Sequence, residues 1–422
     1  MTKKYQSFPG MDDILPSEIL SWQRVEKQAR RFLSAWGFQE IRTPVLEPTE
    51  LFTRSIGETT DIVHKEMYTF QDRGERQMTL RPEMTASVAR AVIQHGLLKT
   101  AKSLSLYYLG PMFRAERPQA GRKRQFHQIG AELINQKGPE TDLRILRVNY
   151  EFLLSLGLSN IRLRLNDLSL MSGSKGEQVR AFLRDFFRKR QNELDEDSKY
   201  RLDRNVLRIF DSKVERVRAI AAEVPWENIA PVSPDFSEVL GRLKMLGIPF
   251  EIDRRLVRGL DYYTGLVFEI ALEGLGAQDA VSGGGRYDHL YQELGGPGAP
   301  CTGFSIGIER LLTALLHAGQ KGGPGRCFYI APIAESFHSP EAEKARGIAI
   351  RLAGAGLEVA PVEPLSKLAD HLKRANQAGA DYVLILGPEE LHQRGVTLKD
   401  MAKREQRFVA EDGIDRACLG LP

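Results

Sequence analysis

The sequence predicts an α+β protein with an antiparallel-sheet core, a helical insertion and a smaller C-terminal α/β domain. Residues 107–114 and 125–133 are strand-like and are joined by a ten-residue polar loop, which predicts an antiparallel hairpin. Residues 173–245 have helical periodicity and high charge, so we expect a helical insertion between sheet segments there. From residue 326 onward, strand-like and helical patterns alternate, as in α/β domains.

The length of the chain favours more than one domain. It has 422 residues, which exceeds the size that one hydrophobic core usually serves. Apolar residues make up 42% and charged residues 27% of the chain, as in ordinary globular proteins. The glycine-rich stretch 321–325 fits a linker, so we predict a first domain at 1–325 and a second at 326–422.

The first elements can be read from the spacing of apolar residues. From Glu18 to Trp36 this spacing is helical, and Gly37 suits a helix C-cap. Residues 38–41 alternate as in a strand, and the prolines that follow favour a sheet edge or an interface. Further strands are expected at 78–80, 267–272, 328–330, 357–359 and 382–386, and a helix from Pro82 onward.

Several classes of protein are disfavoured by composition. No apolar run approaches the roughly 18 residues that span a bilayer, and the N-terminus carries no apolar stretch, so we expect a cytoplasmic protein without a membrane partner. Cys301, Cys327 and Cys418 are widely separated and lack a Cys-x-x-Cys pair, which argues against disulfides and a zinc site. A net charge of +4 is too small to indicate nucleic-acid binding by itself.

Several familiar catalytic motifs are absent from the sequence. It contains no Walker A loop, no His-Glu-x-x-His or other metal-ligand spacing, and no serine-hydrolase elbow. The residues that remain as candidates are arginine, glutamate, glutamine and tyrosine. They suit a site that positions charged ligands rather than one that forms a covalent intermediate.

The predicted hairpin gathers polar residues and glycines on one sheet face. Alternation places one set of side chains on a face of each strand: Gly110, Met112 and Arg114 on the first, and Phe126, Gln128, Gly130 and Glu132 on the second. Ile129, Ala131 and Leu133 then face the core. Such a face has room for a ligand with an amine or an imidazole. A solvent-exposed face with an incidental salt bridge fits the pattern equally well.

Two further segments have a structural and a functional interpretation. In residues 80–85, Pro followed by Glu is a common helix start, and this segment alone favours that over a ligand role for Glu83 or Thr85. Arg310 follows the glycine-rich run 303–307 in the first turn of a predicted helix at 308–316, where a cation opposes the helix dipole. It either faces a bound anion or pairs with a nearby acid.

Two segments combine glycine with groups that bind ligands. Residues 258–265 hold a bidentate anion donor, Arg258, a glycine and the two aromatic hydroxyls of Tyr262 and Tyr263. Three consecutive glycines at 283–285 predict a backbone that passes close to a ligand or another strand, with a tight loop as the alternative.

These segments, in this order, resemble the signature motifs of class II aminoacyl-tRNA synthetases, in the histidyl-tRNA synthetase family. The resemblance covers nearly the whole chain. The three class motifs are similar to residues 37–44, 113–128 and 303–310. The two histidine-specific motifs are similar to residues 256–265 and 283–288, and parts of the family's helical insertion to residues 194–197 and 211–213. The second domain resembles the family's anticodon-binding domain.

The resemblance assigns roles to individual residues. Arg258, Arg114 and Arg310 are expected to be catalytic, with Arg114 on the α-phosphate of ATP, Arg310 on the γ-phosphate and Glu116 also at the ATP site. The histidine pocket would include Arg114 and Arg258 together with Glu83, Met84, Thr85, Gln128, Glu132, Tyr262, Tyr263 and Tyr287. Gln119 and Arg124, in the basic loop of residues 114–124, would contact the acceptor end of tRNA.

The resemblance also implies a reaction and partners. L-Histidine and ATP, with Mg²⁺ bound to the ATP and no structural metal, would give histidyl-adenylate and pyrophosphate, and histidine would pass to the 3' end of tRNA(His). A homodimer is implied. Position 84 is Met where many bacterial members carry Gly. The alternative is the non-aminoacylating regulatory subunit of ATP phosphoribosyltransferase, but that paralogue lacks the anticodon domain and has an eroded motif around the equivalent of Arg258.

Overall fold

The computed structural model describes residues 5–419, apart from 58, 59, 61, 119–121, 172, 213, 231, 273–278, 319–326, 337, 356, 361 and 362. The chain forms two compact units, residues 1–320 and 321–422. The predicted domain boundary after residue 325 falls within 319–326, outside the described residues.

The first unit is built on an eight-stranded sheet in the order β1-β5-β6-β11-β10-β9-β7-β8. Its strands are β1 (Gln39–Glu40), β5 (Leu104–Phe113), β6 (Gln125–Ile134), β7 (Ile161–Asp167), β8 (Phe250–Ile252), β9 (Leu266–Leu272), β10 (Ala280–Arg286) and β11 (Cys301–Gly307). Pairings from β5 to β7 are antiparallel, whereas the outer strands β1 and β8 pair in parallel. The predicted antiparallel core is confirmed.

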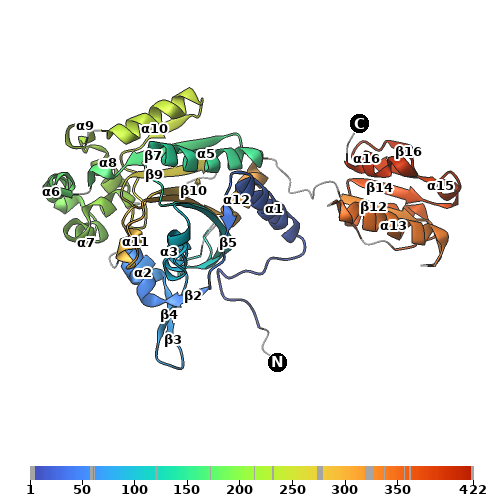
Figure 1. Ribbon diagram of the computed structural model, residues 1–422, viewed down its shortest axis with the longest axis horizontal. Coiled ribbons are helices and arrows are strands. Elements are labelled where there is room, and N and C mark those ends of the chain that lie inside the picture. The colour runs from blue at the N-terminus through green and yellow to red at the C-terminus, as the bar shows by residue number, and fades with distance from the viewer. Residues whose placement is uncertain are drawn as a thin grey trace. The chain divides into compact units, whose positions relative to one another are not determined.

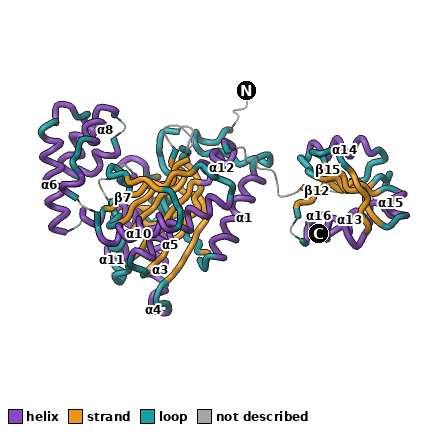
Figure 2. Tube along the Cα trace, turned by 90° about the horizontal axis from the view of Figure 1, so that it is seen from above, coloured by secondary structure: helices purple, strands orange, loops and turns teal. Residues whose placement is uncertain are grey.

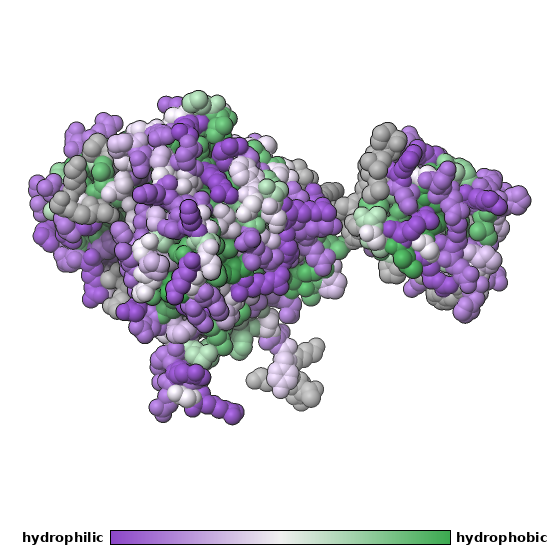
Figure 3. All heavy atoms as spheres, in the orientation of Figure 1, coloured by the Kyte–Doolittle hydropathy of each residue, from purple (hydrophilic) through white to green (hydrophobic). Residues whose placement is uncertain are grey.

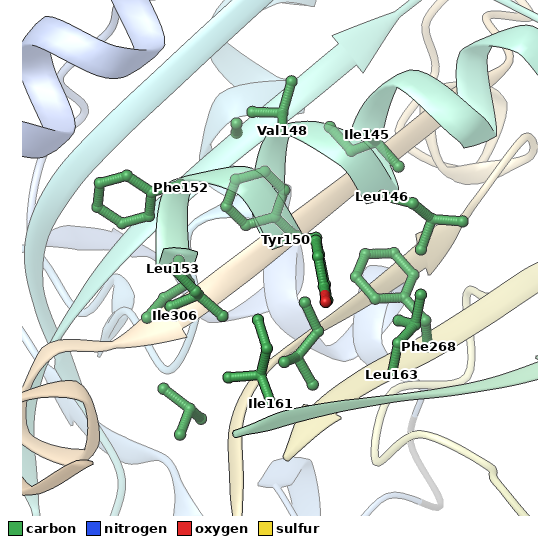
Figure 4. Close-up of a cluster of buried hydrophobic side chains, with 14 of the residues drawn as sticks. Ile145, Leu146, Val148, Tyr150, Phe152, Leu153, Ile161, Leu163, Phe268 and Ile306 are labelled. Carbon is green, nitrogen blue, oxygen red and sulfur yellow. The ribbon is translucent and has the colours of Figure 1, made fainter. Parts of the chain in front are cut away.

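Helices cover one face of this sheet and bury its main hydrophobic core (Figures 1 and 4). They are α1 (Ile19–Ala35), α5 (Pro139–Ser155), α10 (Pro234–Met245) and α12 (Ile308–His317). Ile129, Ala131 and Leu133 of β6 are fully buried in this core, as the alternation along that strand predicts. Side chains at the intervening positions of β6 therefore point to the opposite face.

Shorter elements cover part of that opposite face. They are α2 (Thr49–Ile56), α3 (Thr85–Gln94), α4 (Leu97–Thr100), α11 (Leu290–Glu293) and a π-helical turn, η1 (Ile62–Glu66). A three-stranded sheet adjoins them, with β2 (Leu46–Pro48), β3 (Tyr68–Gln71) and β4 (Gln77–Leu80) in the order β2-β4-β3. The β3–β4 hairpin projects from the unit in Figure 1, and its tip is largely hydrophilic in Figure 3.

Two predicted boundaries differ from the observed ones. The predicted strand at 38–41 is shorter in the structure, because Phe38 is buried in the main core and only two residues pair with β5. Helix α3 begins at Thr85, three residues after the predicted start at Pro82. The carbonyl of Pro82 accepts a hydrogen bond from Arg114 Nε at 2.9 Å, and Arg81 is hydrogen bonded through its backbone to Phe113. These bonds hold the stretch beside β5 in a non-helical path.

A helical insertion follows β7. It comprises α6 (Gly173–Arg188), α7 (Glu196–Arg204), α8 (Glu215–Ala222), α9 (Trp226–Ile229) and the 3₁₀ turns η2 (Ser169–Met171), η3 (Gln191–Glu193) and η4 (Val206–Asp211). These helices have their own hydrophobic core and lie together at one end of the first unit (Figures 1 and 2). The prediction extended the insertion to residue 245, but α10 packs into the main core through Phe236, Val239 and Leu243.

The second unit is a mixed α/β domain with five strands in the order β13-β12-β14-β15-β16. Its elements are β12 (Cys327–Pro332), α13 (Pro340–Gly354), β13 (Glu358–Val359), α14 (Leu368–Gln377), β14 (Tyr382–Leu386), α15 (Pro388–His392), β15 (Gly395–Asp400), β16 (Gln406–Ala410), η6 (Glu411–Gly413) and α16 (Ile414–Leu419). The three predicted strands are present and parallel. The antiparallel strands β15 and β16 were not predicted, so the sheet is mixed rather than largely parallel.

Two expectations about the chain as a whole can be compared with the described residues. None of their helices is long and apolar enough to cross a membrane. Cys301, Cys327 and Cys418 carry thiol groups, and all three are buried.

Candidate active site

A cavity of about 190 Å³ opens on the face of the sheet opposite the main core. Side chains from β5, β6, β9, β10, β11, α3 and α12 line it, together with the irregular segment 256–265. Eleven predicted site residues lie in its wall: Glu83, Thr85, Arg114, Glu116, Gln128, Glu132, Arg258, Tyr262, Tyr263, Tyr287 and Arg310. The structure therefore brings together residues that are up to 227 positions apart, from Glu83 to Arg310.

Two buried carboxylates form one part of the cavity. Glu83 is 4% exposed, and its carboxylate accepts the backbone N–H groups of Thr85 and Ala86, at 2.6 and 2.8 Å. It thus caps α3 and also lines the cavity, and its ligand role stays a prediction. Glu132 is 1% exposed and accepts hydrogen bonds from the hydroxyls of Thr85, at 2.8 Å, and Tyr287, at 2.5 Å.

Burial sets the protonation of these acids. Loss of hydration raises the pKa of Glu132 to about 8, against the opposing effect of its two hydroxyl donors. The pKa of Glu83 is also raised by burial, although its backbone donors favour the charged form. A ligand cation placed between two such carboxylates would stabilise their ionised forms.

Tyrosines surround this acidic part. The ring of Tyr262 lies 4.8 Å from that of Tyr263 and 5.5 Å from that of Tyr287, measured between centroids. Tyr108 of β5 lies directly opposite Gly130 of β6, where a β-carbon would stand 2.2 Å from the tyrosine ring. Gly130 therefore makes room for an aromatic wall, and an exposed sheet face, the alternative for this hairpin, is ruled out.

Arginines gather in the other part of the cavity. The pKa of Arg310 is lowered, mainly by burial and further by the neighbouring Arg122 and Arg114, and Glu116 partly offsets this. Arg310 lies in the first turn of α12 and donates a hydrogen bond to the carbonyl of Ala280 at 2.9 Å. The guanidinium of Arg114 lies over the ring of Phe126 at 5.1 Å. Such a cluster of partly buried cations attracts a polyanion.

Arg258 packs against the three-glycine strand. Its Nη1 donates to the carboxylate of Glu269 in β9 at 2.5 Å. Gly283 of β10 pairs with Glu269, and a β-carbon at Gly283 would lie 2.4 Å from Arg258 Nη1. At Gly284 a β-carbon would meet the carbonyl of Gly303 in the next strand at 2.0 Å. The glycines thus make room for the side chain of Arg258 and for the neighbouring strand β11. Because residues 283–285 lie in β10, the alternative of a tight loop there is wrong.

Arg114 and Arg258 connect the two parts of the cavity electrostatically. Arg114 acts on Glu83 in the acidic part and on Arg310 in the basic part. Arg258 is paired with Glu269 and also faces Tyr262 and Tyr263. A ligand cation among the carboxylates and a polyanion among the arginines would therefore meet near these two guanidiniums.

A carboxylate of α12 links the basic part to β6. Glu309 accepts the backbone N–H of His127 at 3.0 Å and lies 3.1 Å from the Nδ1 atom of the same residue. The ring of Trp22, in α1, packs edge-on against His127. This arrangement fixes the start of α12, and with it Arg310, beside Gln128.

Three predicted site residues are not in the cavity wall. Met84 is 1% exposed and packs into a hydrophobic cluster with α3 and β5, where Thr43 donates to its sulfur at 3.1 Å. Arg124 is at the base of the β5–β6 loop, and its Nε donates to the carbonyl of Glu116 at 3.2 Å. Gln119 lies outside the described residues.

Sequence reasoning missed several residues that line the cavity, among them Tyr108, Glu269 and Glu309. Tyr108 lies two positions before Gly110, so the same alternation that selected Gly110 and Arg114 could have identified it. Glu269 is a lone acid in an otherwise apolar strand, which was also a usable signal. Glu309 stood beside the chosen Arg310, but only the fold shows that its partner is His127. Among the described residues, no cluster of three or more His, Cys, Asp or Glu side chains could hold a metal ion.

Comparisons with known proteins agree with this site. The family model described as histidyl-tRNA synthetase matches residues 10–311, and that of an anticodon binding domain matches residues 328–416. A histidine–tRNA ligase from a Cyanothece species is 45% identical over 428 aligned positions, covering 98% of this chain and 96% of the relative. One from Halorhodospira halophila is 44% identical, with 98% and 97% covered.

Solved structures are similar over the full length. The apo histidyl-tRNA synthetase of S. aureus has a TM-score of 0.69 at 29% identity, with 98% of this chain and 99% of that chain covered. The histidyl-tRNA synthetase from a Nostoc species has a TM-score of 0.73 at 21% identity, with 99% and 100% covered, which shows the shared fold. On the extent of the family match and of the similarity to curated relatives, this chain belongs to the histidyl-tRNA synthetase family.

Proposed function

We propose that this protein is a histidine–tRNA ligase, which activates L-histidine with ATP and transfers it to tRNA(His). The full-length similarity to enzymes of that name supports the activity. The observation that carries the mechanism is the division of the cavity into a carboxylate part and an arginine part, with Arg114 and Arg258 acting on both. The ammonium group of an amino acid matches the charge of the carboxylate part, and the phosphates of a nucleoside triphosphate match the charge of the arginine part.

The carboxylate part is proposed to bind histidine. Its ammonium and imidazole groups would be held by Glu83, Glu132, Thr85 and Gln128, against walls formed by the tyrosines. The buried position of both carboxylates supports this, because an apolar amino acid would offer them no cationic or hydrogen-bond-donating group. Such a pocket rejects Leu or Phe by leaving polar groups unpaired rather than by size alone.

The arginine part is proposed to bind ATP. Arg310 would hold the γ-phosphate, and Arg114 the α-phosphate, with Glu116 beside them. A histidine carboxylate oxygen attacks the α-phosphorus, and the bond from that phosphorus to the oxygen bridging to the β-phosphate breaks. Pyrophosphate leaves and histidyl-adenylate remains. Arg258, fixed by Glu269, would stabilise the negative charge that builds up between the two reactants.

Mg²⁺ is proposed to enter with ATP rather than to occupy a protein cage. Mg²⁺ is usually held by substrate phosphates and one or two carboxylates, and Glu116 and Glu269 line the cavity among the arginines. When bound, the ion would offset the charge of the phosphates. The donor set therefore fits a substrate-bound ion.

Transfer to tRNA is the second step. A ribose hydroxyl at the 3' end attacks the carbonyl carbon of the adenylate, and AMP leaves. We propose that the β5–β6 loop, with Gln119 and Arg124, contacts the acceptor end and that the second unit contacts the anticodon. The match of residues 328–416 to an anticodon-binding domain supports the latter.

The protein is also proposed to form a homodimer and to act in the cytoplasm. Exposed apolar side chains in the three-stranded sheet, Leu46 of β2 at 37% and Phe70 of β3 at 44%, support an interface on that sheet, which follows the segment resembling the dimer motif. Three buried thiols suit a reducing compartment. Light scattering after size exclusion measures the mass directly, and a monomer at micromolar concentration would contradict the dimer.

The regulatory-subunit alternative is not favoured. The curated relatives that cover this chain are named histidine–tRNA ligases, and the second unit matches an anticodon-binding domain. A solved chain whose title names both activities, from Bacillus halodurans, is 23% identical to this chain and shows the shared fold alone.

ATP–pyrophosphate exchange tests the first step. Purified protein should support exchange that depends on histidine and is not supported by leucine or phenylalanine at the same concentration. Charging of tRNA with labelled histidine tests the second step. No exchange by the unaltered protein would contradict the proposed enzyme, whereas exchange without charging would contradict only the tRNA contacts.

A further inference from the structure

The segment 256–265 carries four cavity residues, Arg258, Leu260, Tyr262 and Tyr263, but has no regular secondary structure between β8 and β9. Hydrogen bonds hold it at both ends. The side-chain amide of Asn166 donates to the carbonyls of Arg254 and Leu256, at 3.1 and 2.9 Å. The backbone N–H of Thr264 donates to the carbonyl of Arg286 at 2.8 Å. The residues between these ends need another support.

Asp261 supplies that support by contacting the helical insertion. Its Oδ1 accepts hydrogen bonds from Nε of Arg208 at 3.2 Å, from Nη2 of the same guanidinium at 3.0 Å and from the amide of Asn205 at 3.3 Å. The side chain of Arg208 is 11% exposed and that of Asp261 is 28% exposed. Arg208 is thus largely buried and Asp261 is partly exposed, so solvent and salt screen this pair less than a pair between two fully exposed side chains.

The other side of Asp261 fits closely against α2. Its backbone N–H donates to the carbonyl of Ile56 at 3.1 Å. Gly57 has a φ of +98°, and a β-carbon there would lie 2.6 Å from Oδ2 of Asp261. The end of α2 and the turn η4 thus contact Asp261 from two sides. Tyr262 follows directly, so the position of Asp261 determines where its neighbours enter the cavity.

The helical insertion, which has its own hydrophobic core, contacts the segment 256–265. Arg208 belongs to η4, whose Val206 and Ile209 are buried with the insertion helices. Leu256 is part of the same core and Tyr263 packs against it. A second cavity, of about 560 Å³, lies beside this contact, between Arg201 and Arg208 of the insertion and Arg114 and Arg258 of the sheet unit. The facing surfaces are therefore separated by open space next to the Arg208–Asp261 pair.

We propose that the Arg208–Asp261 ion pair positions Tyr262 and Tyr263, so that the helical insertion determines the shape of the histidine pocket. Arg208 and Asp261 are positioning residues, because they act through the tyrosines and are not in the wall of the first cavity. This proposal rests on the proposed function. It differs from a purely structural role, because it requires histidine recognition to change while ATP recognition does not.

The test measures ATP–pyrophosphate exchange as a function of histidine and of ATP. Asp261→Asn removes the charge of one partner with little change in volume, and Arg208→Gln removes the charge of the other and shortens its side chain. Each variant should raise the KM for histidine by about tenfold and leave the KM for ATP within about twofold. The double variant should be little worse than either single one, because both changes disrupt one interaction. Arg208→Lys keeps the charge, so its KM for histidine should lie between that of the unaltered protein and that of Arg208→Gln.

Arg188→Gln provides a matched control. Arg188 lies in the same insertion and pairs with Asp203 at 3.1 Å, but both side chains are more than half exposed. This variant should have the kinetic constants of the unaltered protein.

Three results would overturn the proposal. One is that Asp261→Asn and Arg208→Gln behave like the Arg188 control. Another is that both KM values rise equally, and the third is that the effects of the two variants add fully in the double variant. If the unaltered protein gives no exchange, the proposed function itself fails. Circular dichroism establishes that each variant is folded, and Arg208→Lys is the mildest change should Asp261→Asn not fold.

Discussion

Replacing Glu132 by Gln should stabilise the first unit increasingly as the pH rises. Glu132 is 1% exposed, and its two oxygens accept hydrogen bonds from Thr85 and Tyr287. Burial raises its pKa from the ordinary 4.5 to about 8 in the folded protein without ligand. Glutamine has nearly the same shape and cannot ionise, so the substitution removes the titration while keeping a hydrogen-bonding side chain.

The sign and size of this change in stability follow from the linkage between protonation and folding. Between pH 4.5 and about 8, the folded state holds a proton on Glu132 that the unfolded state has released. The contribution of Glu132 to stability is therefore fully present below about pH 4.5 and is lost as the pH rises to about 8. At about 1.4 kcal/mol per pH unit, the loss between about pH 5.5 and pH 8.5 is roughly 3 kcal/mol.

Urea unfolding followed by tryptophan fluorescence measures this effect. The three tryptophans, Trp22, Trp36 and Trp226, all lie in the first unit, so their signal reports that unit alone. Between pH 5.5 and 8.5, the free energy of unfolding of Glu132→Gln should rise by roughly 3 kcal/mol relative to that of the unaltered protein. Asp142 of α5, whose pKa burial raises to about 6, titrates in both proteins, so its effect cancels in the comparison. An equal difference at the two pH values would refute a raised pKa at Glu132.

Two further substitutions and one chemical labelling experiment test other parts of the structure. Gly283→Ala should lower the rate of ATP–pyrophosphate exchange at least about tenfold, because the new β-carbon would displace the guanidinium of Arg258, and an unchanged rate would argue against close packing there. Glu309→Gln should raise the KM for ATP by roughly fivefold, because an amide oxygen replaces the carboxylate that joins α12 to His127 and so positions Arg310. An ATP KM equal to that of the unaltered protein would show that this link does not position Arg310. Ellman's reagent should react slowly with the native protein and titrate three thiols after unfolding, because all three cysteines are buried; rapid native reaction would contradict their burial.

Local patterns predicted most of the elements around the site. Period-two alternation placed Gln128 and Glu132 opposite the buried Ile129, and the structure has this arrangement because β6 is central and packed on one face. The consecutive glycines indicated a close approach by another group. These signals are local, since they depend on residues one or two positions apart on one strand.

Features that depend on tertiary contacts could not be predicted in this way. The start of α3 is moved from Pro82 to Thr85 by bonds from β5, which lies some thirty residues away in the chain. Position 84 was assigned to the pocket by resemblance, but its side chain turns into a hydrophobic cluster. The assignment of α10 to the main core rather than to the insertion also depends on packing between distant helices. The separation of the cavity into a carboxylate part and an arginine part forms only when strands from distant parts of the sequence pair in one sheet.

The measurement that tests the account most directly compares catalysis and binding in Arg258→Ala. Arg258 faces both parts of the cavity and is proposed to stabilise charge between histidine and ATP. The variant should lose at least about a hundredfold in the rate of histidine-dependent exchange. Its dissociation constant for histidine, measured by calorimetry without ATP, should stay within about threefold of that of the unaltered protein. An unchanged exchange rate, or a loss of histidine binding as large as the loss of rate, would contradict the proposed role of Arg258.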